Sequence, residues 1–158
     1  MSTEPKEVQL WYLASPYLGN EEENFGRILF IAAHLLEHEK LWVFSPILHS
    51  HEMAIEYEPL TYEKWLELDK VILDRCDGLL IAAIEGFKKS RGIKAELRWA
   101  VDSKKPVKFV FWDEKAEIVS ELDRIEIRED QKLIDELLAP VSEEQIGKTE
   151  DEGEEEDE

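Results

Sequence analysis

The strongest constraint on the fold is an almost continuous apolar run in the middle of the chain, Gly78 to Ile84 (GLLIAAI). A strand with one face exposed to solvent alternates apolar and polar residues. A run without that alternation is typical of a strand buried on both faces, as in a parallel sheet covered by helices. The run therefore predicts an α/β protein with helices on both sides of a parallel sheet.

The rest of the chain follows the same plan, because apolar runs alternate with segments of helical periodicity. We expect strands at Val8–Ala14, Leu41–Ser45, Gly78–Ile84, Val107–Trp112 and, shorter, Asp123–Ile127. We expect helices at Asn20–Glu39, Thr61–Arg75, after Gly92, and at Asp130–Leu138, with a loop over Pro46–Pro59. The prediction is a doubly wound, flavodoxin- or Rossmann-like parallel sheet of four to five strands.

Negative charge is concentrated at the end of the chain. The formal net charge is -19, and the segment Glu143–Glu158 holds ten acidic residues and one lysine. Such a segment cannot bury enough apolar surface to order itself, so we expect one domain over residues 1–141 and a disordered acidic tail over 142–158. The tail is either solubilising or an interaction segment. The remaining negative charge argues against binding of duplex nucleic acid.

Three further features of the sequence bear on the cellular compartment of the protein. Cys76 is the single cysteine, so no intramolecular disulfide can form. The N-terminal stretch lacks the pattern of a signal peptide, and no apolar run has the length of a membrane span. We expect a soluble protein of the cytoplasm, with no membrane partner.

Three predicted loops follow the carboxyl ends of strands: Ser15–Asn20, Pro46–Pro59 and Glu85–Gly92. In an open parallel sheet these ends meet at one edge, and ligands bind there near a switch in strand order. We therefore expect the three loops to form one pocket.

Three side chains near that edge are candidates for chemistry. Glu96 lies in the predicted helix beside its apolar stripe; the alternative is a solvated helix glutamate. Asp69 falls in a helical row with Trp65 and Leu73, an unusual place for a carboxylate unless it lies at the edge of the face. Tyr12 lies in the first strand, just before its carboxyl end, and is either a core aromatic or a partner for a carboxylate.

Other residues near the loops give weaker signals. His49 and His51 indicate ligand contact or loop structure better than metal binding, because no third ligand is evident. Cys76 is most simply a buried apolar residue. In FKKSRGIKAELRWA, a basic group (Lys88, Lys89, Arg91) precedes a helix N-terminus, where an anion would be stabilised, and Gly92 allows close approach.

Five motifs occur in order: YLASPY, VFSPILHSH, WLELD, CDGLL and SRGIKAE. Together they make the chain resemble the nucleoside 2-deoxyribosyltransferase superfamily, and within it the DUF1937 branch, over about Leu10–Val107. The resemblance implies a glutamate nucleophile at Glu96, an aspartate near the leaving base at Asp69, and a tyrosine that positions the nucleophile at Tyr12.

The resemblance also implies a substrate and its contacts. It predicts cleavage or transfer of the N-glycosidic bond of a 2′-deoxynucleoside or its 5′-monophosphate, without cofactor or metal, in a homodimer or larger homo-oligomer. Expected substrate contacts are Ser15, Pro16, Tyr17, His49, Lys89, Ser90, Arg91 and Gly92. The alternative is a non-catalytic nucleotide-binding or sensing module.

One departure from the superfamily concerns phosphate. Hydrolases of this superfamily that act on deoxynucleotides carry an arginine in the first loop, whereas the loop here reads SPYLGN. Lys88, Lys89 or Arg91 would have to take its place.

Overall fold

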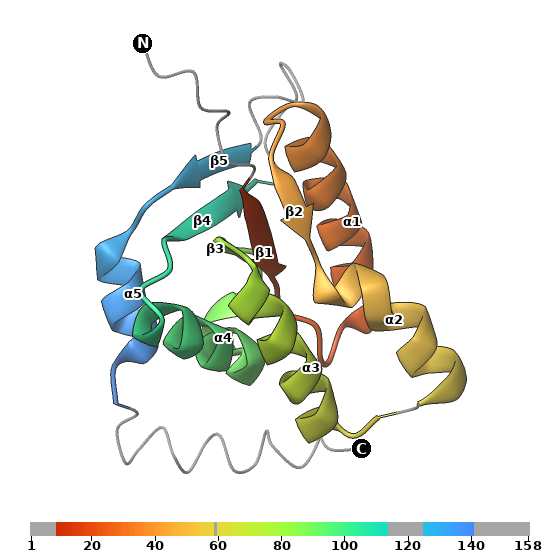
Figure 1. Ribbon diagram of the computed structural model, residues 1–158. Helices are drawn as coiled ribbons and strands as arrows, with labels where there is room; N and C mark the ends of the chain where they lie inside the picture. The colour runs from red at the N-terminus through yellow and green to blue at the C-terminus, as the bar shows by residue number, and fades with distance from the viewer. Residues whose placement is uncertain (1–8, 59, 114–124, 141–158) are drawn as a thin grey trace, which may run out of the picture.

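The computed structural model describes residues 9–58, 60–113 and 125–140, which form an α/β domain around a five-stranded sheet (Figure 1). The strands lie in the order β2-β1-β3-β4-β5. Their bounds are β1 Leu10–Ala14, β2 Trp42–Phe44, β3 Gly78–Ala82, β4 Val107–Trp112 and β5 Ile125–Arg128. The helices are α1 Glu21–Glu37, α2 Pro46–Tyr57, α3 Tyr62–Arg75, η1 Phe87–Lys89, α4 Arg91–Asp102 and α5 Gln131–Leu138. The predicted doubly wound α/β class is confirmed.

The apolar run that suggested the fold is β3, the central strand, and all its residues are buried. It pairs in parallel with β1 on one side and β4 on the other. Gly78 begins β3 directly under the Trp11 ring, where a Cβ would come within 2.3 Å of the ring atoms. Only glycine lets these two central strands approach as they do.

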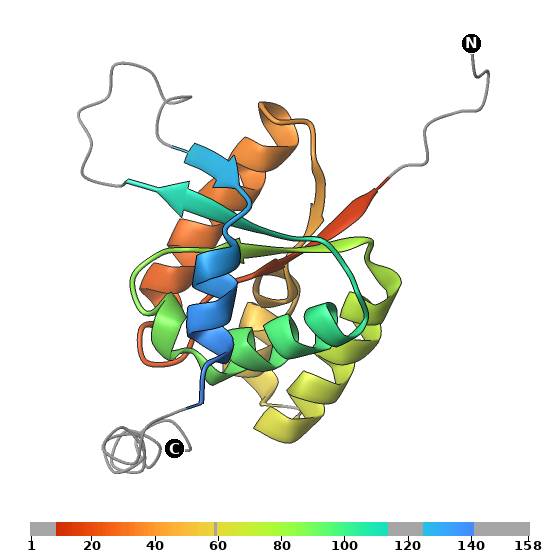
Figure 2. The same cartoon turned by 90° about the vertical axis from the view of Figure 1, so that its left-hand side faces the viewer.

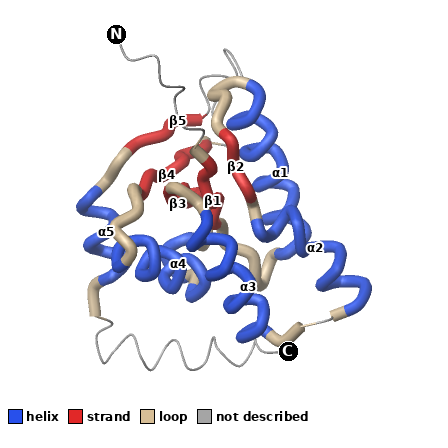
Figure 3. The backbone as a smooth tube through the Cα atoms, viewed as in Figure 1, coloured by secondary structure: helices blue, strands red, loops and turns tan. Residues whose placement is uncertain are grey.

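Two hydrophobic cores cover the two faces of the sheet, and alternation along β1 decides which side chain enters which core. Tyr12 and Ala14 face the core made with α3, α4 and α5. Trp11 and Leu13 face the core made with α1. Figure 2 shows the strands between α1 on one side and α3 and α4 on the other, and Figure 3 shows the strands enclosed by helices.

The predicted loop over Pro46–Pro59 is wrong, because most of it is helix α2. The Ser45 side chain caps the helix by accepting a hydrogen bond from Leu48 N. Pro46 occupies the first helical position, where its missing N–H costs nothing and its fixed φ suits the helix. The Ser-Pro pair thus starts a helix here.

The fifth strand also differs from a uniformly parallel sheet. β5 pairs with β4 in antiparallel fashion, with Phe109 opposite Arg128. Within the predicted Asp123–Ile127 only residues 125–127 are described, and the strand extends to Arg128. The last helix lies where it was expected, and Asp130 caps it by accepting a hydrogen bond from Leu133 N. The expected tail, 142–158, lies outside the described residues.

Some of the apolar residues of α1 face the core and others face solvent. In α1, Ile28, Ala32 and Leu35 are buried, whereas Leu29 and Leu36 are exposed. Asn20 precedes α1, but its side chain makes no capping hydrogen bond. In the described ranges, no helix is both long and apolar enough to span a bilayer.

Candidate active site

A cavity of about 780 Å³ opens at the carboxyl ends of β1, β2 and β3. The order β2-β1-β3 means that the chain turns in opposite directions from β1 and from β3, so the cavity lies at the switch point of the sheet. Its walls come from the loop after β1, the helices α1, α2 and α3, and the segment that leads into α4. The size suits a small organic ligand.

Glu96 lies at the inner wall of the cavity and is only 6% exposed. Ser90 caps α4 by accepting from Ile93 N, and this fixes the start of the helix. Glu96 comes three residues after Ile93 and one before Leu97, both of which are completely buried. Helical periodicity therefore turns the carboxyl inward, and the solvated alternative does not hold.

Tyr12 faces the Glu96 carboxyl from β1 and is completely buried. The interaction between the two groups lowers the pKa of Glu96. It falls short of full hydrogen-bond geometry, because the Tyr12 hydroxyl and Glu96 Oε2 are both buried without a partner. Burial, followed by the charges of Glu96 and Asp69, raises the pKa of the Tyr12 phenol strongly, so it stays protonated as a donor.

Burial dominates the ionisation of Glu96 and raises its pKa from 4.5 to about 8. The Tyr12 hydroxyl opposes part of this rise, and the charge of Asp69 adds to it. An orphaned, buried carboxyl oxygen is costly, and such groups are concentrated at functional sites. Glu96 is thus arranged to react with or bind a ligand that occupies the cavity.

Asp69 lines the same cavity from α3. Burial raises its pKa from 3.8 to about 6. Trp65 lies one turn before it and also lines the cavity, while Leu73 lies one turn after it in the core. The predicted row of Trp65, Asp69 and Leu73 is therefore confirmed, with the carboxyl at the rim of the apolar layer.

Asp69 and Glu96 act as a coupled pair of acids. The charge of Asp69 adds to the rise in the pKa of Glu96, so the pair gives up its protons in two separate steps. With pKa values near 6 and 8, the two carboxyls together carry one proton at neutral pH. Such a pair can supply one carboxylate and one carboxylic acid at neutral pH.

The loop after β1 brings Ser15, Pro16 and Tyr17 to the cavity, as expected. Asn24 of α1 holds this loop by donating from its side-chain nitrogen to the Tyr17 carbonyl, at 3.2 Å. The Ser15 hydroxyl is buried and has no hydrogen-bond partner among the described residues. It is therefore a second polar atom that a ligand can satisfy.

The segment around the start of α4 brings Lys89, Ser90, Arg91 and Gly92 to the cavity, again as expected. A Cβ on Gly92 would lie 3.6 Å from Glu96 Oε1, so glycine keeps the space in front of the carboxyl open. The Arg91 guanidinium lies over the Tyr62 ring at 5.5 Å. Lys88 instead pairs with Glu136 on α5, at 2.9 Å.

His49 does not reach the cavity, and the expectation that it contacts substrate is corrected. It is exposed on α2, with its ring near Phe44. His51 lines the cavity in its place and is buried. Helical spacing places Ile47, Ser50, His51, Ala54 and Ile55 on the cavity side of α2, and the Ser-Pro helix start could have revealed this face.

Within the described residues there is no cluster of three or more histidine, cysteine or acidic side chains that could hold a metal ion. Cys76 is buried, and burial raises the pKa of its thiol. It packs in the core with Leu73 and Leu79, so it is a structural residue.

A family model matches residues 10–114, well over half of the 158-residue chain. The chain belongs to the DUF1937 family. DUF1937 is described as a domain of unknown function. The matched region runs from β1 through β4, so Tyr12, Asp69 and Glu96 all belong to the DUF1937 domain. No curated protein matches the chain.

Proposed function

We propose that this protein cleaves or transfers the N-glycosidic bond of a 2′-deoxynucleoside or its 5′-monophosphate, with Glu96 as the nucleophile. The observation that carries the proposal is the buried Glu96 carboxyl, which has an unpartnered oxygen, opens on the cavity and is flanked by Tyr12 and Asp69. The likeness of five motifs to nucleoside 2-deoxyribosyltransferases supports the same reaction.

The two carboxyls suit the two halves of such a reaction when the proton that they share lies on Asp69, which is the less populated arrangement at neutral pH because the pKa of Glu96 is raised further than that of Asp69. The Glu96 carboxylate attacks the anomeric carbon as the bond from that carbon to the base nitrogen breaks. The electron pair of that bond leaves with the base, and Asp69 donates a proton to it. A glycosyl ester of Glu96 results. The Tyr12 hydroxyl donates towards Glu96 and favours the carboxylate that attacks.

The second step reverses the first with a new partner. Water or another base attacks the anomeric carbon of the ester, and the electrons of the ester bond return to the Glu96 carboxylate. The proton of the attacking group passes to Asp69, which is then ready to donate again. Water as the partner gives hydrolysis, and a base gives transfer.

The substrate class is supported by the lining of the cavity. Trp65, Tyr62 and Leu66 offer an apolar, aromatic surface on which a flat base can lie. Lys89 and Arg91 supply positive charge beside the start of α4, which suits a 5′-phosphate. Because acidic side chains also line the cavity, phosphate binding would depend on these two cations.

Release of free base, followed by chromatography of nucleosides and 5′-monophosphates, tests the proposal. Glu96→Gln should lower the rate by roughly a thousand-fold or more, because the amide cannot form the glycosyl ester. The matched control is Glu67→Gln, an exposed position on α3 that pairs with Lys64. Equal rates for wild type and Glu96→Gln, or no release from any substrate, would overturn it.

A non-catalytic nucleotide-binding module is the second candidate. Burial raises the pKa of Glu96 to about 8, so the proton that Asp69 and Glu96 share at neutral pH lies mainly on Glu96. A neutral Glu96 can bind a ligand but does not attack it. Calorimetry decides between the two: tight binding of a nucleotide that is recovered intact favours the module.

A further inference from the structure

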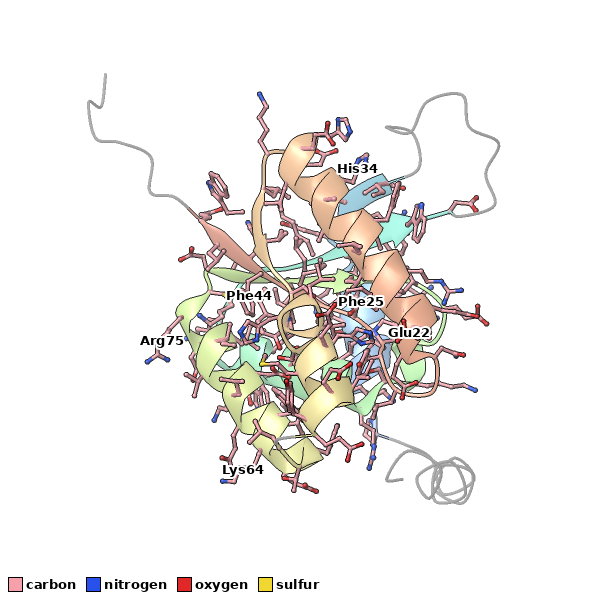
Figure 4. All side chains as sticks on the ribbon, turned by 90° about the vertical axis from the view of Figure 1, so that its right-hand side faces the viewer. Glu22, Phe25, His34, Phe44, Lys64 and Arg75 are labelled. Carbon is pink, nitrogen blue, oxygen red and sulfur yellow. The ribbon has the colours of Figure 1, made fainter. Side chains whose placement is uncertain are left out.

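His51 has a defined partner on each ring nitrogen. Its side chain is 4% exposed, with Nδ1 2.6 Å from the Tyr17 hydroxyl and Nε2 3.3 Å from Glu22 Oε1. The Phe25 ring stacks on the imidazole with centroids 4.2 Å apart and planes inclined by 14°. Glu22 and Phe25 lie at the N-terminal end of α1, beside α2 (Figure 4). The imidazole is thus fixed in position and orientation.

These contacts determine how the protons are arranged. A carboxylate only accepts hydrogen bonds, so Glu22 requires a proton on His51 Nε2. In the neutral imidazole Nδ1 is then an acceptor, and the Tyr17 hydroxyl donates its proton to it. Burial, with the nearby Glu21 and Glu22, raises the pKa of Tyr17, so this phenol keeps its proton.

The arrangement leaves the Tyr17 oxygen with unused lone pairs and no free proton. Tyr17 and His51 both line the cavity, and so does Glu21, which adds negative charge to this wall. A ligand group that meets the Tyr17 oxygen can form a hydrogen bond with it only by donating one. A carbonyl or phosphate oxygen would meet an acceptor without a proton between them.

We propose that Tyr17, oriented by His51 and Glu22, is a specificity-determining acceptor that selects a ligand bearing a hydrogen-bond donor at this wall, either a sugar hydroxyl or an exocyclic amine. Tyr17 contacts the ligand, and His51 and Glu22 are positioning residues. The inference rests on the proposed function only in taking a nucleoside or nucleotide as the ligand. Loss of such a hydrogen bond in a buried site costs roughly ten- to hundred-fold in affinity.

Matched pairs of ligands separate the two sources of the donor. Deoxycytidine and deoxyuridine 5′-monophosphates differ by an amine in place of a carbonyl, and deoxyguanosine and deoxyinosine 5′-monophosphates by an amine in place of hydrogen. A 2′-deoxynucleotide and its 2′,3′-dideoxy analogue differ by the 3′-hydroxyl. Calorimetry in the Glu96→Gln protein, which should not consume these compounds, gives the Kd ratio within each pair.

At least one pair should show a preference of about ten-fold or more for the donor-bearing member. Tyr17→Phe should reduce that ratio to near one. His51→Gln should also reduce it, because the Tyr17 proton is then free to point elsewhere. The control is His49→Gln, two residues away on α2 but exposed and off the cavity, which should keep the ratio.

The outcomes separate this inference from the proposed reaction. A ratio that survives Tyr17→Phe, or the absence of any preference, overturns the inference even if wild type releases base. A ratio that depends on Tyr17 supports it even if no base is released, in which case the proposed reaction alone fails. Failure of every compound to bind overturns both.

Discussion

Two buried ionisable side chains face the same cavity, and they are treated in opposite ways. Glu96 on α4 has one carboxyl oxygen with no hydrogen-bond partner, and burial raises its pKa to about 8. His51 on α2 is as well buried, yet it has a partner on each nitrogen and an aromatic ring stacked on its face.

In the proposed reaction, the difference separates the wall that reacts, at Glu96, from the wall that shapes the ligand site, at His51. An unpaired buried carboxyl is costly to the folded state, and a ligand that pairs with it recovers that cost. A fully paired imidazole contributes to stability and holds its neighbours in place. A substitution of Glu96 should therefore lower activity more than stability, and a substitution of His51 should lower stability more than activity.

The largest effect is expected at the acid that serves Glu96. Asp69→Asn removes the proton donor, so turnover should fall by roughly a hundred- to ten-thousand-fold. The control is Asp74→Asn at the exposed end of α3, which should turn over normally. Steady-state kinetics with the best substrate measures both, and an active Asp69→Asn protein would remove Asp69 from the mechanism.

The dependence of kcat/KM on pH is the second test. The rate should rise as the acid pair loses its first proton near pH 6 and fall as it loses the second near pH 8, with a maximum between them. Each limb should change about ten-fold per pH unit. A single ascending limb would mean that no acid of the pair needs its proton.

Glu96→Gln should stabilise the protein at alkaline pH. The folded state holds the Glu96 proton up to a pKa of about 8, against 4.5 for an ordinary glutamate, so wild-type stability falls as pH rises between these values. The variant lacks this loss, and its Tm should gain several degrees on wild type between pH 5 and pH 9, since about 1 kcal/mol corresponds to roughly 2–4 °C. Thermal unfolding of both proteins across this range would show parallel curves if Glu96 were not the group responsible.

His51→Ala should have the opposite sign and destabilise the protein by about 1–3 kcal/mol, because it removes the stack on Phe25 and the hydrogen bond to Tyr17. His49→Ala, at an exposed position on the same helix, should change stability by less than about 0.5 kcal/mol. Urea unfolding measures both free energies, and equal values would show that burial of His51 contributes nothing.

Glu22→Gln should have the smallest effect. The Glu22 side chain is 79% exposed, so water competes for its contact with His51 Nε2, and that contact should contribute less than about 1 kcal/mol. Urea unfolding of Glu22→Gln beside wild type measures this contribution. A loss as large as that of His51→Ala would mean that Glu22 does more than orient the imidazole.

The same two walls of the cavity show how much of the site could be predicted from the sequence. Asp69 was predictable because it stands in a helical row with Trp65 and Leu73, and Glu96 because it lies beside the apolar stripe of its helix. The period of a helix fixes where both side chains point. Tyr12 lies in the middle of β1, where a core aromatic is the simpler expectation, and only the resemblance to the superfamily singled it out. His51 was not, because Pro46 was taken to open a loop and because its partners come from α1, a contact that no local pattern encodes. The antiparallel pairing of β5 is likewise a long-range contact.

The oligomeric state and the acidic tail remain predictions, which chromatography of the full chain and of a chain ending at residue 141 can address.

The close contact between Gly78 and Trp11 has a consequence for mutational screening. Any side chain at position 78 would displace the Trp11 ring, and Trp11 is the chain neighbour of Tyr12. In a scan scored by turnover alone, position 78 would therefore rank with Glu96 and Asp69, although it contributes no group to the cavity. Scoring the same library by protein abundance would separate them: variants of Gly78 should be depleted, whereas Glu96→Gln should accumulate as an inactive but well-folded protein.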